Sequence, residues 1–198
     1  MFWKSLYNGA KPNILLSTGN YGSALAAAAY EGRFDVVRVL ISKGADPNQL
    51  LSTGIYGSGL VAAAAAGRIS VLEYLIHEAK ADANFLTEHH GRYGSPLAAA
   101  ANLGNIKSVK ILLRAGADPN LVLENPCFSN ALHASQADLY PSDQELVEYK
   151  VSELTRSQLD QQTPVAEAKA IVARVLENLA RLHELERHAP GLLEDSGD

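Results

Sequence analysis

Histidine and cysteine are the residues of this sequence that could hold a metal or act as a nucleophile. His89 and His90 are adjacent, His133 stands apart, and Cys127 is the only cysteine. No metal site is expected, because adjacent residues in an extended segment point to opposite faces and no other His or Cys lies at ligand spacing. Cys127 has no companion motif for catalysis and cannot form an internal disulfide. The glycines also lack the spacing of a phosphate-binding loop, so we predict no catalytic residue, no metal and no cofactor.

Tyrosine is the aromatic residue that recurs at a regular spacing. Tyr21-Gly22-Ser23, Tyr56-Gly57-Ser58 and Tyr93-Gly94-Ser95 follow one another at spacings of 35 and 37 residues, and Phe128-Ser129-Asn130 is a weaker copy 35 residues later. Tyrosine is favoured among the residues that dominate binding energy, so direct contact with a partner is one interpretation. A residue that occurs once in every unit more often serves the unit itself. We therefore expect these rings to stack from loop to loop, with direct contact as the alternative.

Two further sequence motifs recur, always in the same order after the tyrosines. A glycine stands at 32, 67 and 104, and an exit segment of the type Gly-Ala-Asp-Pro-Asn stands at 44–48, 80–84 and 116–120. Each unit is therefore predicted to contain a short alanine-rich helix, a glycine turn, a second helix with an apolar face, and the exit segment. The alanines should let neighbouring first helices approach closely.

Helix-terminating residues agree with these units. Ser23, Ser58, Ser95 and Asn130 stand where an N-cap is needed, and Gly44 and Gly116 can end the second helices in the left-handed conformation. The second unit has Lys80 in place of that glycine and one additional residue. A bulged or extended helix end is predicted there.

These units resemble the ankyrin family, whose repeat begins with T-P-L-H and ends with G-A-D-x-N. Residues 95–120 match that pattern closely, and the tyrosine-glycine openings are similar to ankyrin arrays that are abundant in fungal proteins. The resemblance implies an all-α fold, an ankyrin-repeat solenoid of stacked helix-turn-helix units with β-hairpin loops. It also implies that His133, the counterpart of the family's histidine, stabilises a turn through hydrogen bonds.

The predicted organisation has three parts. Residues 1–139 are ankyrin repeats: a half repeat at 1–13, three full units at 14–120 and an incomplete fourth at 121–139. Residues 140–190 are a C-terminal helical cap of two helices, at about 142–156 and 164–187, and residues 191–198 are a flexible acidic tail. The longer helix has an apolar stripe that either covers the last repeat, which we favour, or pairs with a partner helix or a second copy. Phe2, Trp3 and Leu6 either form a half-repeat cap or indicate a piece of a longer array.

Composition limits the kinds of partner. The chain of 198 residues is 47% hydrophobic and 20% charged, with a net charge of −5. Its lysines and arginines do not cluster as a phosphate backbone requires, so nucleic acid is not an expected partner. No apolar run approaches the roughly 18 residues of a membrane span. A cytoplasmic protein is expected, with a nuclear location left open.

The resemblance implies that a partner binds in the concave groove formed by the loop tips and the exposed faces of the first helices. A protein partner is the expected ligand, and self-association through the C-terminal helix is left open. The alternative is a small-molecule or catalytic site between the apolar loops and the alanine-rich helices, with Tyr93, His89 or His133 as acid or base. The candidate groove residues are Tyr30, Glu31, Ile55, Tyr56, Leu86, His89, His90, Arg92, Tyr93, Asn102, Leu103 and Phe128.

Overall fold

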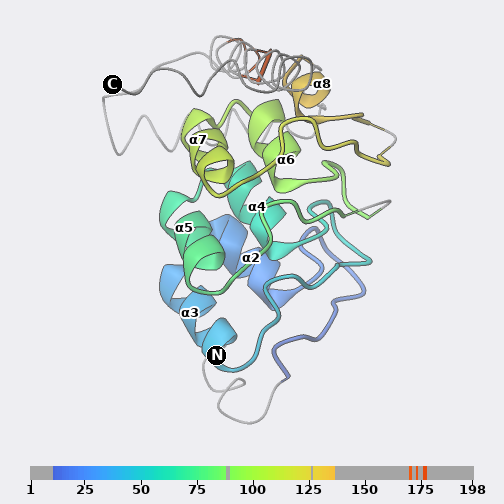
Figure 1. Ribbon diagram of the computed structural model, residues 1–198. Coiled ribbons are helices and arrows are strands. Elements are labelled where there is room, and N and C mark those ends of the chain that lie inside the picture. Colours follow the sequence, from blue (N-terminus) through green and yellow to red (C-terminus); the bar gives the residue numbers. More distant parts are fainter. Residues whose placement is uncertain are drawn as a thin grey trace, which may run out of the picture.

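The computed structural model describes residues 11–87, 90–125 and 127–136, together with Ala170, Ala173, Leu176 and Glu177. Helices and loops alternate along this part of the chain, and the helices come in antiparallel pairs that stack on one another (Figure 1). The pairs are α2 (Ala24–Glu31) with α3 (Phe34–Ser42), α4 (Gly59–Ala66) with α5 (Ile69–His77), and α6 (Pro96–Asn102) with α7 (Ile106–Arg114), followed by α8 (Ala131–Gln136). The predicted helical solenoid is confirmed.

The helices form two layers, with the first helices of the units in one and the second helices in the other (Figure 1). Small side chains allow the first helices to lie close together, because Ala62 to Ala64 and Ala98 to Ala101 have no exposed surface. The second helices turn their leucines toward the first layer, where Leu40, Leu72, Leu75 and Leu112 are also fully buried. The core is therefore continuous along the stack, as a repeat array requires.

The predicted N-caps hold the start of each first helix. Ser23 Oγ accepts the Ala26 N–H at 3.1 Å, and the hydroxyls of Ser58 and Ser95 accept the equivalent N–H groups at 3.2 Å. Asn130 Oδ1 accepts the His133 N–H at 2.8 Å in the same way. Each cap satisfies a donor that the helix itself leaves without a partner.

The ends of the second helices also follow the prediction. Gly44 and Gly116 have φ angles of 88° and 87°, and the residue after each donates its N–H to the carbonyl five residues earlier, in Leu40 and in Leu112. In the second unit Lys80 takes the left-handed conformation with φ 61°. The following N–H reaches six residues back to Leu75 at 2.8 Å, so the additional residue is accommodated as the predicted bulge.

Asparagines of the exit segments connect each unit to the next. Asn13 Oδ1 accepts the Asp46 N–H at 2.8 Å, Asn48 Oδ1 accepts the Asp82 N–H at 2.8 Å, and Asn84 Oδ1 accepts the Asp118 N–H at 2.7 Å. Asn13 and Asn84 also donate their amides, at 2.9 Å, to the carbonyls of Gly44 and Gly116. The exit motif therefore supplies a ladder of hydrogen bonds along the stack, and Asn13 takes part in it as the later asparagines do.

The loops differ from the expected β-hairpins. Each is closed by one backbone hydrogen bond, and in the described segments the only β-pairing is an isolated bridge between Leu15 and Ser23. Glycines explain the difference, since Gly54, Gly57, Gly91 and Gly94 all have positive φ, which bends the backbone away from extended strands. The four closing bonds join Leu16 to Gly22, Leu51 to Gly57, Thr87 to Gly94 and Leu123 to Ser129 at 2.8–2.9 Å.

At the C-terminal end of the stack, Leu176 joins the hydrophobic core with an exposed fraction of 1%. The neighbouring Glu177 accepts a hydrogen bond from Gln136 of α8 at 3.4 Å. The predicted half repeat before residue 11, the helix at 142–156, most of the helix at 164–187 and the tail at 191–198 lie outside the described residues.

Candidate interaction surface

An aromatic column runs along the stack between the loops and the first helices. Tyr21 and Tyr56 stack with ring centroids 6.0 Å apart, Tyr56 and Tyr93 at 6.3 Å, and Tyr93 and Phe128 at 6.4 Å. The interplanar angles of 14°, 18° and 11° show that all four rings are nearly parallel. The prediction that these rings stack from loop to loop is confirmed.

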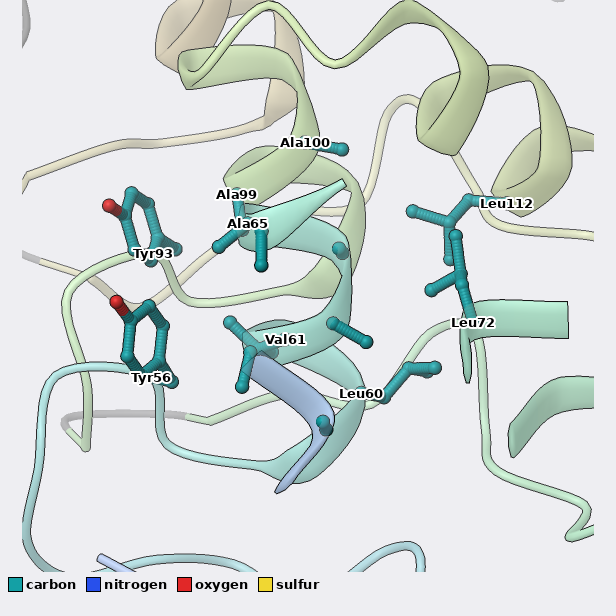
Figure 2. Close-up of a cluster of buried hydrophobic side chains, with 14 of the residues drawn as sticks. Tyr56, Leu60, Val61, Ala65, Leu72, Tyr93, Ala99, Ala100 and Leu112 are labelled. Carbon is teal, nitrogen blue, oxygen red and sulfur yellow. The ribbon is translucent and has the colours of Figure 1, made fainter. Parts of the chain in front are cut away.

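The column fills the space between loops and helices. Figure 2 shows Tyr56 and Tyr93 beside Val61 and Ala65, on the side of the first helices opposite the leucine core. Their hydroxyl groups point the same way (Figure 2). The column thus ties each loop to the helix layer through buried apolar contact.

Five of the twelve candidate groove residues lie inside the protein. Asn102 has no exposed surface, and its amide donates to the Ala134 carbonyl of α8 at 2.9 Å. The four aromatic candidates are almost fully buried as well. All five side chains therefore lie beneath the predicted groove surface and do not project from it. These five residues are Tyr30, Tyr56, Tyr93, Asn102 and Phe128.

The remaining candidates are accessible, apart from His89, which lies outside the described residues. Glu31 and Leu86 are exposed, and Ile55, His90, Arg92 and Leu103 are half-buried. The structure brings Ile55 and Arg92 together, because the Arg92 N–H donates to the Ile55 carbonyl at 2.8 Å. Leu86 precedes Thr87, whose hydrogen bond to Gly94 closes the loop, whereas Arg92 lies inside the loop, shortly before Gly94.

Tyr21 completes the first end of the column but was not among the predicted contact residues. Its hydroxyl donates to Glu31 Oε1 at 3.1 Å, which links the first loop to the end of α2. Burial, and then the hydrogen bond to Glu31, raise the pKa of Tyr21 to about 12. Burial, with the neighbouring phenol of Tyr30, also raises the pKa of Tyr56. Both phenols are therefore protonated at neutral pH and cannot act as general bases there.

His133 has the structural role that the family resemblance implies. Its Nδ1 accepts the Ser129 N–H at 3.2 Å, and its ring lies edge-on to Phe128 at 6.2 Å. In the described segments, no group of three or more His, Cys, Asp or Glu side chains is arranged to hold a metal ion.

Two residues that the sequence analysis did not single out connect the ends of first helices to the next unit. Arg68 Nε donates to the Tyr30 carbonyl at 2.8 Å, and Asn105 Nδ2 donates to the carbonyls of Ala64 and Ala65 at 3.0 and 2.8 Å. Both follow a turn glycine directly. That shared position was the signal that could have identified them.

Comparisons with known proteins agree with this architecture. Residues 25–122 match the family model for ankyrin repeats, in three copies, and no curated protein matches the chain. None of the helices that the structure describes is long and apolar enough to cross a membrane. The family model covers ankyrin repeats in general, so the similarity to fungal arrays stays a resemblance of the tyrosine-glycine openings. Residues 25–122 therefore form three ankyrin repeats, and this part of the chain belongs to the ankyrin-repeat family.

Proposed function

We propose that this protein binds a partner protein along the surface formed by the loops and the ends of the first helices. Ankyrin repeats are generally protein–protein interaction modules, which supports a protein as the ligand. The partner would lie over the aromatic column and contact Glu31, Ile55, His90, Arg92 and Leu103. Leu86 and His89 extend the same proposal to the longest loop.

The observation that carries the proposal is the hydrogen bonding between successive loops. The Ile55 N–H donates to the Asn20 carbonyl at 2.9 Å, and the Arg92 N–H donates to the Ile55 carbonyl at 2.8 Å. The Asn125 amide continues the connection to the Gly91 carbonyl at 3.4 Å. The described parts of four loops are therefore hydrogen-bonded into one strip, and a surface that is preorganised in this way loses less entropy on binding.

The chemical variety of the strip also favours recognition. Directly before each ring of the column stands a different side chain, namely Asn20, Ile55, Arg92 and Cys127. All four are exposed or half-buried, while the rings behind them, except for Tyr21, are buried. A constant buried residue next to a variable accessible one lets the fold stay the same while the contacts differ from unit to unit.

A small-molecule or catalytic site between loops and helices receives less support. Tyr56, Tyr93 and Phe128 occupy that region and are almost fully buried there. Of the three candidate acid or base residues, Tyr93 is buried in the stacked column, and His133 accepts the Ser129 N–H at 3.2 Å. His89 lies outside the described residues. A native mass spectrum of the purified protein tests this alternative, because a retained small molecule would add a defined mass.

The test of the proposal is loss of partner capture in a triple variant, with His90, Arg92 and Leu103 each replaced by Ala. Proteins captured from the source cell by the parent should be lost from the variant, while the melting temperature stays close to that of the parent. Glu73→Ala is the control, because Glu73 is exposed on α5 in the other helix layer. Equal capture by the parent and the triple variant would place the binding surface elsewhere.

A further inference from the structure

Among the residues that the structure describes, the aromatic column ends at Tyr21. Tyr56 stacks on one face of the Tyr21 ring at 6.0 Å. The Tyr30 ring centroid is 5.4 Å from that of Tyr21 and 4.9 Å from that of Tyr56. A ring stacked on the outer face of Tyr21 would be closer to Tyr21 than to Tyr56. Tyr30 therefore lies beside the pair and does not cover the outer face of Tyr21. Tyr21 is half-buried, and within the described residues no ring packs on its outer face.

A carboxylate stands beside this open ring. Glu31 Oε1 accepts the hydrogen bond of the Tyr21 hydroxyl at 3.1 Å, and the Glu31 side chain is exposed. Glu31 is the last residue of α2, where the helix carbonyls already produce a negative potential. The second and third units have the neutral residues Ala66 and Leu103 at this place. The charge of Glu31 is therefore unfavourable for its own helix and departs from the repeat.

In the part of the chain that the structure describes, no Lys, Arg or His side chain is hydrogen-bonded to this carboxylate. The nearby Arg68 uses its Nε to donate to the Tyr30 carbonyl at 2.8 Å. Within the same residues no ion pair involves Glu31. An ionised carboxylate has lone pairs for further donors beyond the Tyr21 hydroxyl.

From this arrangement we propose that Tyr21 and Glu31 form a binding site for an arginine side chain of the partner. A guanidinium group is planar, so it stacks on an aromatic face as the next member of the column would. It can also give paired hydrogen bonds to the adjacent carboxylate, which an ammonium group cannot match in geometry. Charge complementarity thus selects a basic partner residue, and the open ring face selects arginine over lysine. The inference rests on the proposed function, since it names one residue type that the partner presents at the first unit.

The experiment uses the full chain and small probes, so it does not depend on knowing the partner. N-acetyl-arginine amide is titrated into protein with labelled tyrosine rings, and the ring signals are followed by nuclear magnetic resonance. We expect saturable shifts of the Tyr21 signals with a dissociation constant on the order of 1–10 mM. The lysine analogue should bind more weakly, and the neutral citrulline analogue should give no saturable shift.

Two substitutions assign the effect. Glu31→Gln should weaken arginine binding by about fivefold or more, because it removes the charge while keeping the side-chain shape. In Tyr21→Leu the signals of the neighbouring Tyr30 and Tyr56 rings, which lie 5.4 and 6.0 Å from Tyr21 in the parent, should show no saturable shift. The control Glu73→Gln on α5 should bind as the parent does. An unchanged dissociation constant in Glu31→Gln, or equal binding of arginine and citrulline, would overturn the inference. The triple variant of the groove tests the proposed function separately, so arginine binding could fail while partner capture still depends on the groove.

Discussion

Individual buried polar atoms show where the repeat departs from its own pattern. Ser108 on α7 is fully buried at the position that Val71 occupies on α5, and its hydroxyl has no hydrogen-bond partner among the described residues. Thr87 Oγ1 is in the same situation, at a loop position where two other units have Leu51 and Leu123. A buried hydroxyl without a partner lowers stability, because it loses its bonds to water and gains none.

We expect Ser108→Ala to raise the free energy of unfolding by about 1 kcal/mol, since the change removes the hydroxyl and leaves little empty space. Urea denaturation followed by circular dichroism measures the change. Ser135→Ala is the matched control, because the buried Ser135 donates its hydroxyl to the Leu132 carbonyl at 2.7 Å. If both variants gained equal stability, helix propensity and not the lone hydroxyl would be the cause.

The tyrosines of the column predict a loss of stability at alkaline pH. The unfolded chain ionises its phenols near pH 10, whereas burial raises the pKa of Tyr56 in the folded protein. The folded state then holds a proton that the unfolded state releases, so the contribution is complete below pH 10 and declines as the pH rises above it. For this residue the decline is up to about 1.4 kcal/mol for each pH unit.

The comparison of the parent with Tyr56→Phe isolates this effect. The free energy of unfolding of each protein is measured by denaturant titration at several values between pH 9 and 11.5. The parent should lose stability more steeply than the variant, because lysine ionisation is common to both. Parallel curves would mean that Tyr56 ionises alike in the folded and unfolded chains.

At the scale of helices and turns, the exit of the second unit is the irregular element. Lys80 has φ 61°, a conformation that glycine adopts without strain and that Gly44 and Gly116 adopt in the neighbouring units. Its side chain compensates in part, because Nζ donates to the His77 carbonyl at 2.7 Å. The bulge is thus a permitted but strained helix end.

Lys80→Gly should therefore raise the free energy of unfolding by roughly 0.5–1 kcal/mol, since it relieves the left-handed backbone at a solvent-exposed site. Thermal melts measure the shift. The reciprocal control is Gly44→Ala, which should lower the free energy of unfolding by a similar amount. No atom lies within 4 Å of a Cβ placed at Gly44, so any loss there comes from the backbone angle alone. A neutral Lys80→Gly would show that the bulge carries no strain.

At the scale of the whole molecule, the end of the stack needs a cover. A terminal repeat exposes its apolar face unless a capping element packs on it. We propose that the C-terminal segment at 140–190 supplies this cap, supported by the burial of Leu176 and by the hydrogen bond between Gln136 and Glu177. The alternative is that the apolar stripe of this segment pairs with another chain.

The variant Leu176→Ala distinguishes a cap on the stack from pairing with another chain. If the segment is a cap, truncation of this buried side chain should lower the free energy of unfolding by about 2–5 kcal/mol without changing the molar mass. Denaturant melts and light scattering on the same samples measure both quantities. Ala170→Ser is the control, because Ala170 is exposed. A variant that melts like the parent but shifts from dimer to monomer would instead assign the stripe to self-association.

Local features of this protein could be predicted from the sequence by itself. The serine caps, the glycine turns and the bulge before Ala81 depend on residues at most six positions apart, so their types alone specify them. The repeat period could be read directly from the recurrence of these local motifs. The stacking of Tyr21, Tyr56 and Tyr93 was also predictable, because a periodic aromatic in a periodic fold meets its own copy.

Only the tertiary structure decided which of the predicted groove residues are accessible. Whether Asn102 is buried or Glu31 exposed depends on what neighbouring units place around them, and those units lie more than thirty residues away in the sequence. The ladder from Asn13 to Asp46 spans 33 residues, and the contact from Gln136 to Glu177 spans 41. The surroundings of Tyr21 have the same origin, because only the assembled stack shows that this ring has Tyr56 on one face and the Glu31 carboxylate at its hydroxyl.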